Sequence, residues 1–541
     1  MLCRLFKSML SPLPLQRSPL DHPIVNRKGK HKDMADVQAK GFTSIVLLLL
    51  FVFLCLPINS RGRQLTTTTN PTTFFVSRKI DIVGTQNPSP TINPTASTPP
   101  SPVSSPSVPT STNPTPPPSP VSSPIPSIPT PANPPPPPSP PASLGNTFDV
   151  RDYGAKGDGV TDDTKAFQAT WAAACNAEAS KVVVVPLGFQ FLVGPISFSG
   201  VNCKPDIVFQ LDGTIIAPTS AAAWGSGTLH WLEFTKLRGI TIQGQGTIEG
   251  RGSVWWGSST GDDSTSNTEN SGRMPHAKPT ALRIYGSSNV IATGIMLKNS
   301  PQCHLKFDSC NAVEVSNVTV SSPADSPNTD GIHLQDSEDV SIHNTNLACG
   351  DDCVSIQTGC SNVRIHDVNC GPGHGISIGG LGKGNTQAVV SDVSVQDVSM
   401  VGTLTGVRIK TWQGGSGSVK NVMFSNVNVN GVETPIMIDQ FYCDQKKACN
   451  NQTAAVALSD ITYRNIKGTY TVEPVHLACS DSNPCSNIHL SDIQLMKAGS
   501  QTNDPFCWGA FGDLQGTIEP PITCLQHRTS INLNITIDIH L

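Results

Sequence analysis

Three short motifs place acidic and imidazole side chains at equal spacing along the chain. They begin at Asp330, Asp352 and His374, and each step between them is 22 residues; Asp351 precedes Asp352 directly. If 22 residues form one coil, parallel strands about 4.8 Å apart stack these side chains on one face. Carboxylates this close repel as anions, so at least one pKa rises and a proton is kept. A protonated acid beside an ionised base is what glycoside hydrolysis requires.

Two cations follow one coil later. In the segment Val407-Arg-Ile-Lys410 the apolar residues alternate with Arg408 and Lys410, which therefore project from the same outer face. Fixed cations beside carboxylates indicate a substrate that is itself a carboxylate, and Arg can hold it through two parallel hydrogen bonds. His333 projects outward by the same alternation, either towards substrate or as an ordinary surface residue.

Each motif taken alone also has a simpler structural interpretation. Gly350-Asp-Asp352 could be a polar turn, or part of an Asp/Asn ladder that stabilises the corners of a solenoid. The paired cations could form a solvated face. His374 lies between two glycines, which allow another backbone or a ligand to approach closely, so a core histidine is not expected. The coincidence of the motifs on one predicted face favours a functional site.

A repeated phrase predicts the strands that position these residues. A polar pair followed by Val-x-Ile-x-Asn/Asp-Val recurs after residue 146 at spacings of 27, 23, 30 and 29, starting at Val313, Val340, Val363, Val393 and Val422. Alternation gives each copy one buried face, and the period is that of a solenoid. Parallel stacking buries continuous rows of Val and Ile, so we predict an all-β fold, a parallel β-helix. A β-sandwich, the alternative, has turn signals every ~8–12 residues and fits less well.

One amphipathic helix is predicted, from Thr164 to Cys175. Its place at the start of the domain predicts that it caps the hydrophobic end of the solenoid. The solenoid domain is assigned to residues 146–541.

The chain before this domain has a different composition. Of the 46 prolines in the whole protein, 24 lie between Pro88 and Pro141, and no Asp, Glu, Lys or Arg occurs from Ile82 to Phe148. Such a segment buries too little apolar surface to offset its ordering entropy, so residues 61–145 are predicted to be a disordered linker. Its Ser-Pro-Pro segments resemble the hydroxyproline-rich glycoproteins of plant cell walls, and this resemblance implies the alternative of a spacer that tethers the protein to a wall.

Residues 1–60 contain the only long apolar run, Ile45–Leu56. Its 12 residues are too short for a hydrocarbon core of ~30 Å. Basic residues precede it and small residues follow, which is typical of a secretory signal peptide. Met34 would place the run at the usual depth, so residues 1–33 are interpreted as an upstream extension. An uncleaved signal anchor is the alternative.

The overall composition excludes several classes of protein. A net charge of −4 argues against a nucleic-acid binder. Fourteen cysteines follow the signal and form no paired CxxC clusters, so disulfides are expected rather than a metal site. The close pairs are plausible bridges: Cys443/Cys449, Cys479/Cys485 and Cys507/Cys524. In a secreted chain, N-glycosylation is expected at three acceptor motifs: Asn317, Asn451 and Asn534.

Four ordered motifs resemble a known family. Asn328-Thr-Asp330, Gly350-Asp-Asp352, Gly373-His-Gly375 and Arg408-Ile-Lys410 occur in the order and spacing of polygalacturonases of glycoside hydrolase family 28. The segment Phe148–Gly159 also resembles the start of plant members, and the resemblance spans about residues 146–541.

The resemblance implies a right-handed parallel β-helix that hydrolyses α-1,4-linked galacturonan in pectin with inversion. By motif position, Asp351 is the expected general acid, and Asp330 and Asp352 would orient and deprotonate the attacking water. His374 would hold the protonation state of the acid. Members of the family are unusual inverting enzymes, because their carboxylates lie closer than the ~6.5–9.5 Å typical of inversion.

The resemblance also implies the groups that bind substrate. Arg408 and Lys410 would bind galacturonate carboxylates, together with Asn328 and with Tyr442 in the setting Gln440-Phe-Tyr442. The expected partner is a pectic polysaccharide, with no metal, cofactor, nucleic acid or membrane span, and the protein is expected to be a monomer secreted to the cell wall.

Two other functions remain open from sequence. A polysaccharide lyase on the same fold would use Ca²⁺ and an Arg base and leave an unsaturated, ultraviolet-absorbing product. A non-enzymatic wall protein would only bind pectin through its solenoid.

Overall fold

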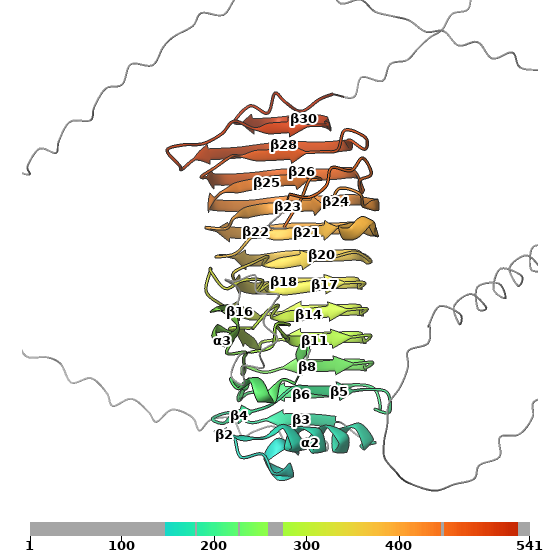
Figure 1. The fold of residues 1–541 in the computed structure, drawn as a ribbon, viewed down its shortest axis with the longest axis vertical. Coiled ribbons are helices and arrows are strands. Elements are labelled where there is room, and N and C mark those ends of the chain that lie inside the picture. The colour runs from blue at the N-terminus through green and yellow to red at the C-terminus, as the bar shows by residue number, and fades with distance from the viewer. Residues whose placement is uncertain (1–146, 179–180, 226–227, 258–273, 445–447, 528–541) are drawn as a thin grey trace, which may run out of the picture. The chain divides into compact units, whose positions relative to one another are not determined.

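A computed structural model describes residues 147–527 except 179–180, 226–227, 258–273 and 445–447, and these residues form a parallel β-helix (Figure 1). The predicted fold class is therefore confirmed. The predictions for residues 1–60 and 61–145, and the acceptor Asn534, lie outside the described residues.

Two sheets run the length of the solenoid, and every ladder between their described strands is parallel. The first sheet, called sheet A, has 19 strands. They are β1 (Thr147–Asp149), β2 (Asp158–Asp162), β3 (Lys181–Val185), β4 (Gln190–Leu192), β6 (Ile207–Leu211), β7 (Thr214–Ile216), β9 (Arg238–Gln243), β10 (Thr247–Glu249), β12 (Ser288–Thr293), β13 (Met296–Lys298), β15 (Asn311–Ser316), β16 (Thr319–Ser321), β18 (Glu338–Ala348), β20 (Cys360–Cys370), β22 (Gln387–Val401), β24 (Ser416–Val432), β26 (Ala457–Tyr470), β28 (Cys485–Lys497) and β30 (Ala510–Glu519).

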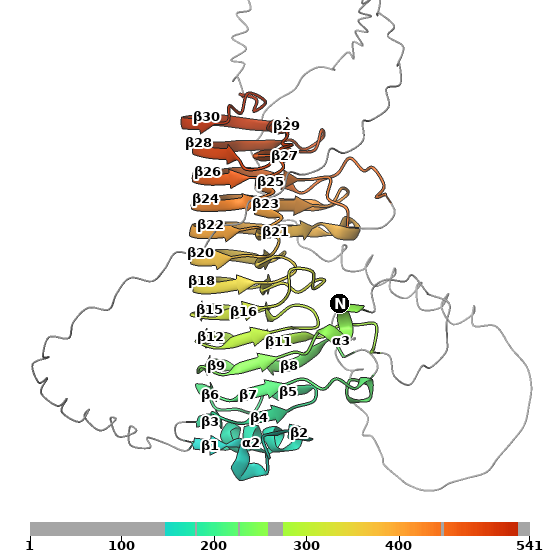
Figure 2. The ribbon, with the colours of Figure 1, turned by 90° about the vertical axis from the view of Figure 1, so that its left-hand side faces the viewer.

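The second sheet, called sheet B, has 11 strands that stack one above another (Figure 2). They are β5 (Ile196–Ser199), β8 (His230–Thr235), β11 (Thr280–Tyr285), β14 (Leu305–Asp308), β17 (Ile332–Gln335), β19 (Val354–Ile356), β21 (Ile376–Leu381), β23 (Thr405–Thr411), β25 (Thr434–Asp439), β27 (Val475–Ala478) and β29 (Phe506–Trp508).

The repeated phrase sets the register of sheet A. Its first branched residues pair in one continuous row, in which Val313 pairs with Val340, Val340 with Val363, and so on to Val393 and Val422. All five side chains are at most 2% exposed. The predicted stacking of Val and Ile rows is therefore confirmed, and it supplies the continuous core of the solenoid.

The Asn or Asp of the phrase bends the chain at each coil. Asn344, Asp367, Asp397 and Asn426 have φ between 52° and 55°, in the left-handed region. Asn and Asp tolerate this region better than other non-Gly residues. Their side chains join successive coils, as when Asn426 Nδ2 donates to Asp397 Oδ1 over 2.9 Å. Long strands such as β22 and β24 therefore bend at these residues without losing their ladder.

The predicted helix is present as α2 (Thr164–Asn176) at the N-terminal end of the solenoid (Figure 1). It buries Phe167 and Trp171, and the Trp171 ring lies against Phe198 and Phe234 at 5.1 and 5.5 Å between centroids. The helix therefore covers the end of the core, as predicted. The remaining short helices are η3 (Val150–Tyr153), η4 (Ala221–Ala223), α3 (Ser253–Trp256) and η6 (Lys383–Asn385). None of the described helices is long and apolar enough to cross a membrane.

The three predicted close cysteine pairs are disulfides, and Cys175–Cys203 and Cys353–Cys370 are two more. Four cysteines are buried thiols instead: Cys303, Cys310, Cys349 and Cys360. Among the acceptor asparagines, Asn317 and Asn451 are exposed.

Candidate active site

The ends of three neighbouring strands of sheet B position the acidic motifs. Ile332 of β17 pairs with Val354 of β19, which pairs with Ile376 of β21. The residues two positions earlier are Asp330, Asp352 and His374, which therefore occupy equivalent places on consecutive coils. The 22-residue spacing brings these side chains together as predicted.

Asp330 and Asp352 border a cleft of about 300 Å³ on the outer face of sheet B. Its lining also includes Asn328, His333, Asp351, Lys410 and Tyr442, whereas the predicted residues His374 and Arg408 reach the site only through their contacts with Asp351 and Asp352. The outward-facing His333 is thus a cleft residue, which resolves the alternative that the sequence left open.

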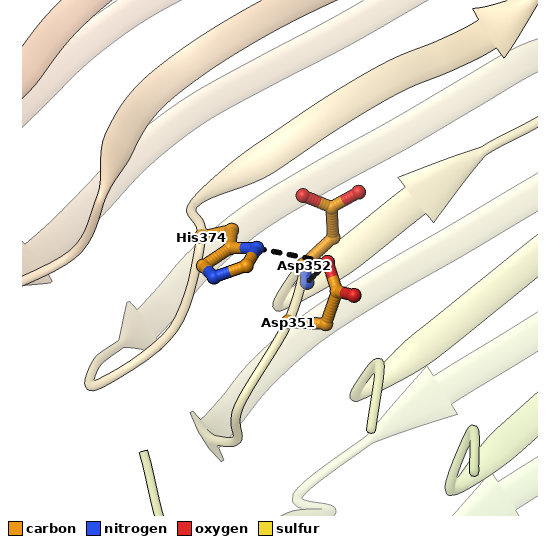
Figure 3. Close-up of side chains that lie close together, drawn as sticks. All are labelled: Asp351, Asp352 and His374. Atoms are coloured by element: carbon orange, nitrogen blue, oxygen red, sulfur yellow. Dashed lines mark hydrogen bonds and ion pairs between the residues drawn. The ribbon is translucent and has the colours of Figure 1, made fainter. Parts of the chain in front are cut away.

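Asp351 and His374 form a hydrogen-bonded pair (Figure 3). His374 Nδ1 lies 2.9 Å from Asp351 Oδ1, and Asn328 Nδ2 donates to Asp351 Oδ2 over 3.2 Å. Burial opposes ionisation of this carboxyl, but the hydrogen bond and charge of His374 outweigh it and lower the pKa of Asp351. The imidazole therefore controls the proton affinity of this carboxyl.

Asp352 is held by both cations. Arg408 Nη2 and Lys410 Nζ donate to its two oxygens over 2.6 and 2.8 Å, and its side chain is only 3% exposed. Arg408 and Lys410 are themselves 7% and 6% exposed. The interpretation of the cations as a solvated face is therefore wrong, because their charge neutralises a buried carboxylate.

Asp330 is a cleft carboxyl whose pKa is raised. Burial raises its pKa, and the charges of Asp351 and Asp352 raise it further, against the opposing effect of His333. Ser355 Oγ donates to Asp330 Oδ2 over 2.7 Å, and His333 Nδ1 lies 3.3 Å from the same oxygen. One carboxyl with a raised pKa was predicted, but it is Asp330 and not the expected acid Asp351.

Two serines that were not predicted complete the site. Ser377 Oγ donates to Asp352 Oδ1 over 2.8 Å and accepts from Arg408 Nε over 3.0 Å. Ser355 plays the corresponding part at Asp330, described above. The sequence pattern could have indicated both serines. Ser355 follows the acidic motif and Ser377 follows the histidine motif, each at an outward position of the next strand.

Aromatic rings close the cleft beside the cations. Lys410 Nζ lies 5.3 Å from the centre of the Tyr442 ring, and Trp412 packs edge-on against that ring at 5.6 Å. Burial raises the pKa of Tyr442 to about 12, so the phenol stays protonated and can donate a hydrogen bond. Trp412 was not predicted.

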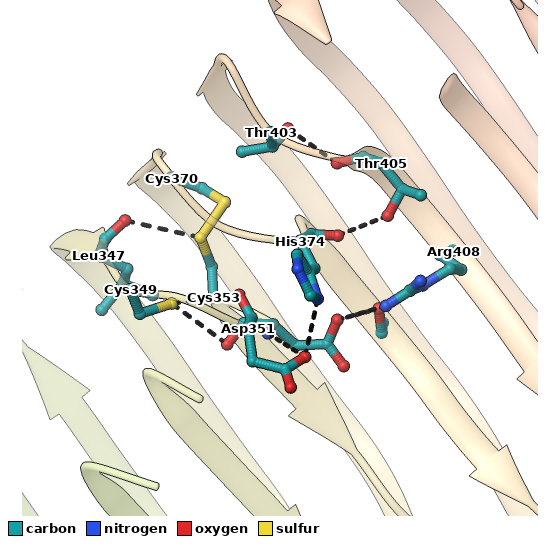
Figure 4. The surroundings of a disulfide bond; sticks show 11 residues. Leu347, Cys349, Asp351, Cys353, Cys370, His374, Thr403, Thr405 and Arg408 are labelled. Atoms are coloured by element: carbon teal, nitrogen blue, oxygen red, sulfur yellow. Dashed lines mark hydrogen bonds and ion pairs between the residues drawn. A yellow bond between two sulfur atoms is a disulfide. The ribbon is translucent and has the colours of Figure 1, made fainter. Parts of the chain in front are cut away.

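Backbone contacts hold the turn that carries His374 (Figure 4). The His374 amide donates to the carbonyl of Asp351 over 2.7 Å, and Thr405 Oγ1 donates to the carbonyl of His374. The Cys353–Cys370 disulfide joins two coils beside this turn. The histidine is therefore positioned by neighbouring coils rather than by a free loop.

Asp351, Asp352 and His374 are also the one group of described residues whose ligand atoms, within 4.8 Å of one another, could hold a metal ion. The two carboxylates already face Arg408, Lys410 and His374. Because the chain's own cations compensate their charge, the donor set fits hydrogen bonding better than metal coordination.

A second hollow of about 470 Å³ lies over sheet A and is lined by Asn and Asp of the corner ladder, including Asn344, Asp367 and Asp397. It contains no cationic side chain, so it does not favour an anionic ligand.

Comparison with known proteins agrees with this geometry. The family described as Glycosyl hydrolases family 28 matches residues 175–506. A polygalacturonase of Cryptomeria japonica is 43% identical over 65% of this chain and 67% of its own length. Polygalacturonase-2 of Solanum lycopersicum is 38% identical over 70% of this chain and 81% of its own length.

Solved structures share the fold. The polygalacturonase from Erwinia carotovora aligns with a TM-score of 0.52 at 25% identity, over 64% of this chain and 92% of its own. The endo-xylogalacturonan hydrolase from Aspergillus tubingensis aligns with a TM-score of 0.58 at 24% identity, over 66% and 95%. The family match covers more than half of the chain, so this protein belongs to glycosyl hydrolases family 28 and is a glycosidase.

Proposed function

We propose that the protein is a polygalacturonase that hydrolyses α-1,4-galacturonosyl linkages of pectin by acid/base catalysis with inversion. The observation that carries this proposal is a cleft lined by Asp330, Asp351 and Asp352, whose Asp352 is ion-paired with Lys410 on the lining and with the buried Arg408. The names of the relatives support the same substrate class.

Asp351 is assigned as the general acid. Its Oδ1 faces His374, and its Oδ2, which accepts from Asn328, is the oxygen left to protonate the glycosidic oxygen. The pair can hold one proton between imidazole and carboxyl. Substrate that expels water from the cleft would favour the neutral carboxyl, because desolvation raises a carboxyl pKa.

Asp330 and Asp352 are assigned to the attacking water. Arg408 and Lys410 fix Asp352 through both of its oxygens, and this position suits it to accept a proton from the water. Asp330, with its raised pKa, orients the water beside it. Proton delivery by Asp351 and proton uptake on the water side then take place on neighbouring coils.

Arg408 and Lys410 can bind a galacturonate carboxylate in addition to Asp352. A guanidinium carries five N–H donors, and those on Nε and Nη2 of Arg408 already bond Ser377 and Asp352. Lys410 has three donors and gives one to Asp352. The remaining donors, with the phenol of Tyr442, form the proposed carboxylate site.

The test is the substitution Asp351→Asn. It should abolish the release of reducing ends from polygalacturonate, because the amide cannot supply the proton, while the matched change Asp325→Asn, at an exposed aspartate, should leave the rate unchanged. Retained activity in Asp351→Asn would remove the assigned acid. A calcium-dependent product that absorbs in the ultraviolet would show a lyase instead.

We also propose that the protein acts as a secreted monomer in the cell wall. The signal-like run Ile45–Leu56, the disulfides and the exposed acceptors Asn317 and Asn451 support this location. A fluorescently tagged protein should be found in the cell wall. An enzyme that removes N-glycans should lower its apparent mass. Intracellular retention of an unglycosylated chain would contradict it.

A further inference from the structure

The floor of the active-site face changes character along sheet B. One outward row runs through register pairs from Arg283 and Lys306 to Arg408, by way of His333, Ser355 and Ser377. The same row then continues through Met437, His476 and Phe506. The cleft is therefore followed, on its C-terminal side, by apolar and aromatic side chains on the same face.

We call Met437, His476, Phe506 and Trp508 the aromatic terrace. Trp508 belongs to the neighbouring outward row, which continues from Lys410 through Asp439 and Ala478. Phe506 is 42% and Trp508 52% exposed, although both lie in strands. At about 4.8 Å per strand, three steps place Phe506 about 14 Å from Arg408 along the floor. In Figure 2, β21, β23, β25, β27 and β29 form this continuous column.

Specific contacts hold the two rings in place. Trp508 Nε1 donates to Asp481 Oδ1 over 2.8 Å, and Phe506 stacks on His476 with centroids 5.0 Å apart. His476 in turn forms an ion pair of 2.9 Å with Glu473. Exposed rings fixed in this way are a preorganised platform for a flat ligand.

The charges around the terrace disfavour a carboxylate. Strands β25, β27 and β29 contain no Lys or Arg, while Asp481 bonds to Trp508, Glu473 lies against His476, and Asp439 is in the row of Trp508. Within these three strands the one basic side chain is His476, and its Nδ1 already lies 2.9 Å from Glu473 Oε1. The face of an aromatic ring is itself electronegative, so an anion placed here would lose its hydration and meet repulsion.

Resting on the proposed function, we infer that the aromatic terrace binds a methyl-esterified galacturonosyl unit of the pectin chain whose free galacturonate units occupy the cleft. An ester is neutral, and its methyl group buries apolar surface against Phe506. The C–H edges of the sugar ring complement the negative faces of Phe506 and Trp508. The terrace thus lets the enzyme accept partially esterified pectin.

The test compares one polygalacturonate preparation before and after partial methyl esterification. For the wild type, kcat/KM for reducing-end release should be retained or raised on the esterified polymer. Phe506→Ala and Trp508→Ala should each lower kcat/KM on that polymer by about 2- to 10-fold and leave the unesterified polymer nearly unchanged. Met437→Lys should raise kcat/KM on the unesterified polymer relative to the esterified one, because it places a cation on the terrace.

The control is Met496→Ala, which removes an exposed apolar side chain (63% exposed) from β28 in sheet A and should change neither rate. Melting temperatures of all variants show whether β29 stays folded, and Met437→Lys tests the inference independently of that strand. Equal effects on both polymers would overturn the inference. A mass in solution that doubles in the wild type but not in Trp508→Ala would also overturn it, because the terrace would then contact a second copy. A wild type that cleaves neither polymer would instead refute the proposed function.

Discussion

At the scale of single residues, three neighbouring carboxylates have different hydrogen-bonding and charged partners. Asp352 faces Arg408 and Lys410, Asp351 faces His374, and Asp330 faces a hydroxyl and a second imidazole. Opposite charge favours the ionised form and burial opposes it, so one cleft can hold both an anion and a proton. The roles proposed above depend on these partners more than on the distances between the acids.

Asp330 gives a prediction about stability and pH. Because its pKa is raised, folded Asp330 keeps a proton at a pH where the unfolded chain has lost it. The free energy of unfolding therefore falls as the pH rises. The fall begins near the ordinary carboxyl pKa of about 3.9 and ends above the pKa of folded Asp330. Asp330→Asn removes this loss, and at neutral pH it should raise the free energy of unfolding by about 1 kcal/mol while abolishing activity.

Urea unfolding between pH 3 and neutrality checks this, with Asp325→Asn as the exposed control. The advantage of Asp330→Asn should vanish at the acidic end. A difference that is constant with pH, or a variant that is less stable at neutral pH, would contradict the assigned pKa direction.

Ser377 gives a second prediction at this scale. Its hydroxyl bridges Asp352 and Arg408 in a fully buried position. Ser377→Ala leaves Arg408 Nε without this acceptor, which should lower the free energy of unfolding by about 1–3 kcal/mol and kcat by about tenfold. Reducing-end assays and urea unfolding measure both effects, and Ser394→Ala, on β22 in sheet A, is the matched control. An unchanged kcat would show that Asp352 does not need the bridge.

At the scale of elements, the turns before the strands of sheet B matter most. The turn before β21 carries His374 and is packed against the next coil, where the peptides of Thr405 and Gly406 lie directly above Gly375. Gly375 has φ 86°, and a β-carbon there would lie 2.2 Å from both carbonyl oxygens. No other residue type fits this place without moving the neighbouring coil.

Gly375→Ala should therefore displace His374 and lower both activity and stability. Backbone strain of this kind costs about 1–3 kcal/mol before the clash is counted. Gly402→Ala is the matched control, because Gly402 also has a positive φ of 60° but no atom within 4 Å of the added carbon. Similar losses in the two variants, measured by thermal unfolding and reducing-end assays, would show that the clash is unimportant.

At the scale of the whole molecule, each coil is stabilised mainly by its two neighbours. Ile378, Ile409 and Ile438 illustrate this, since they pair across β21, β23 and β25 and are all fully buried. Damage in one coil should spread first to the adjacent coils and only later to the distant cap at α2.

Ile409→Ala should lower the free energy of unfolding by about 2–5 kcal/mol, because it leaves a cavity in a close-packed row. Hydrogen exchange should show faster opening in β21 and β25 than in β5. Ile291→Ala, at a side chain that is 36% exposed on β12, should have little effect. Uniform loss of protection over the solenoid would contradict nearest-neighbour stabilisation.

The repeat alone was sufficient to predict the solenoid, the row of buried valines and the meeting of Asp330, Asp352 and His374. In a parallel solenoid, residues one period apart become neighbours in space, so a constant spacing of 22 residues is a statement about distance. The four motifs were also specific enough to indicate the family.

Other features depend on the direction of individual side chains and on coils of unequal length. The spacing of the repeat gives no information about either. Sequence placed Arg408 and Lys410 on the outer face, but only their three-dimensional surroundings show that both turn to Asp352 and that Asp330 has the raised pKa. The aromatic terrace was hidden for the second reason: Ile436 pairs with Val475, 39 positions later, so the long loop between them conceals the alignment of Phe506 with Arg408. Local pattern specifies which face a residue occupies, whereas burial and neighbouring charge decide what it does there.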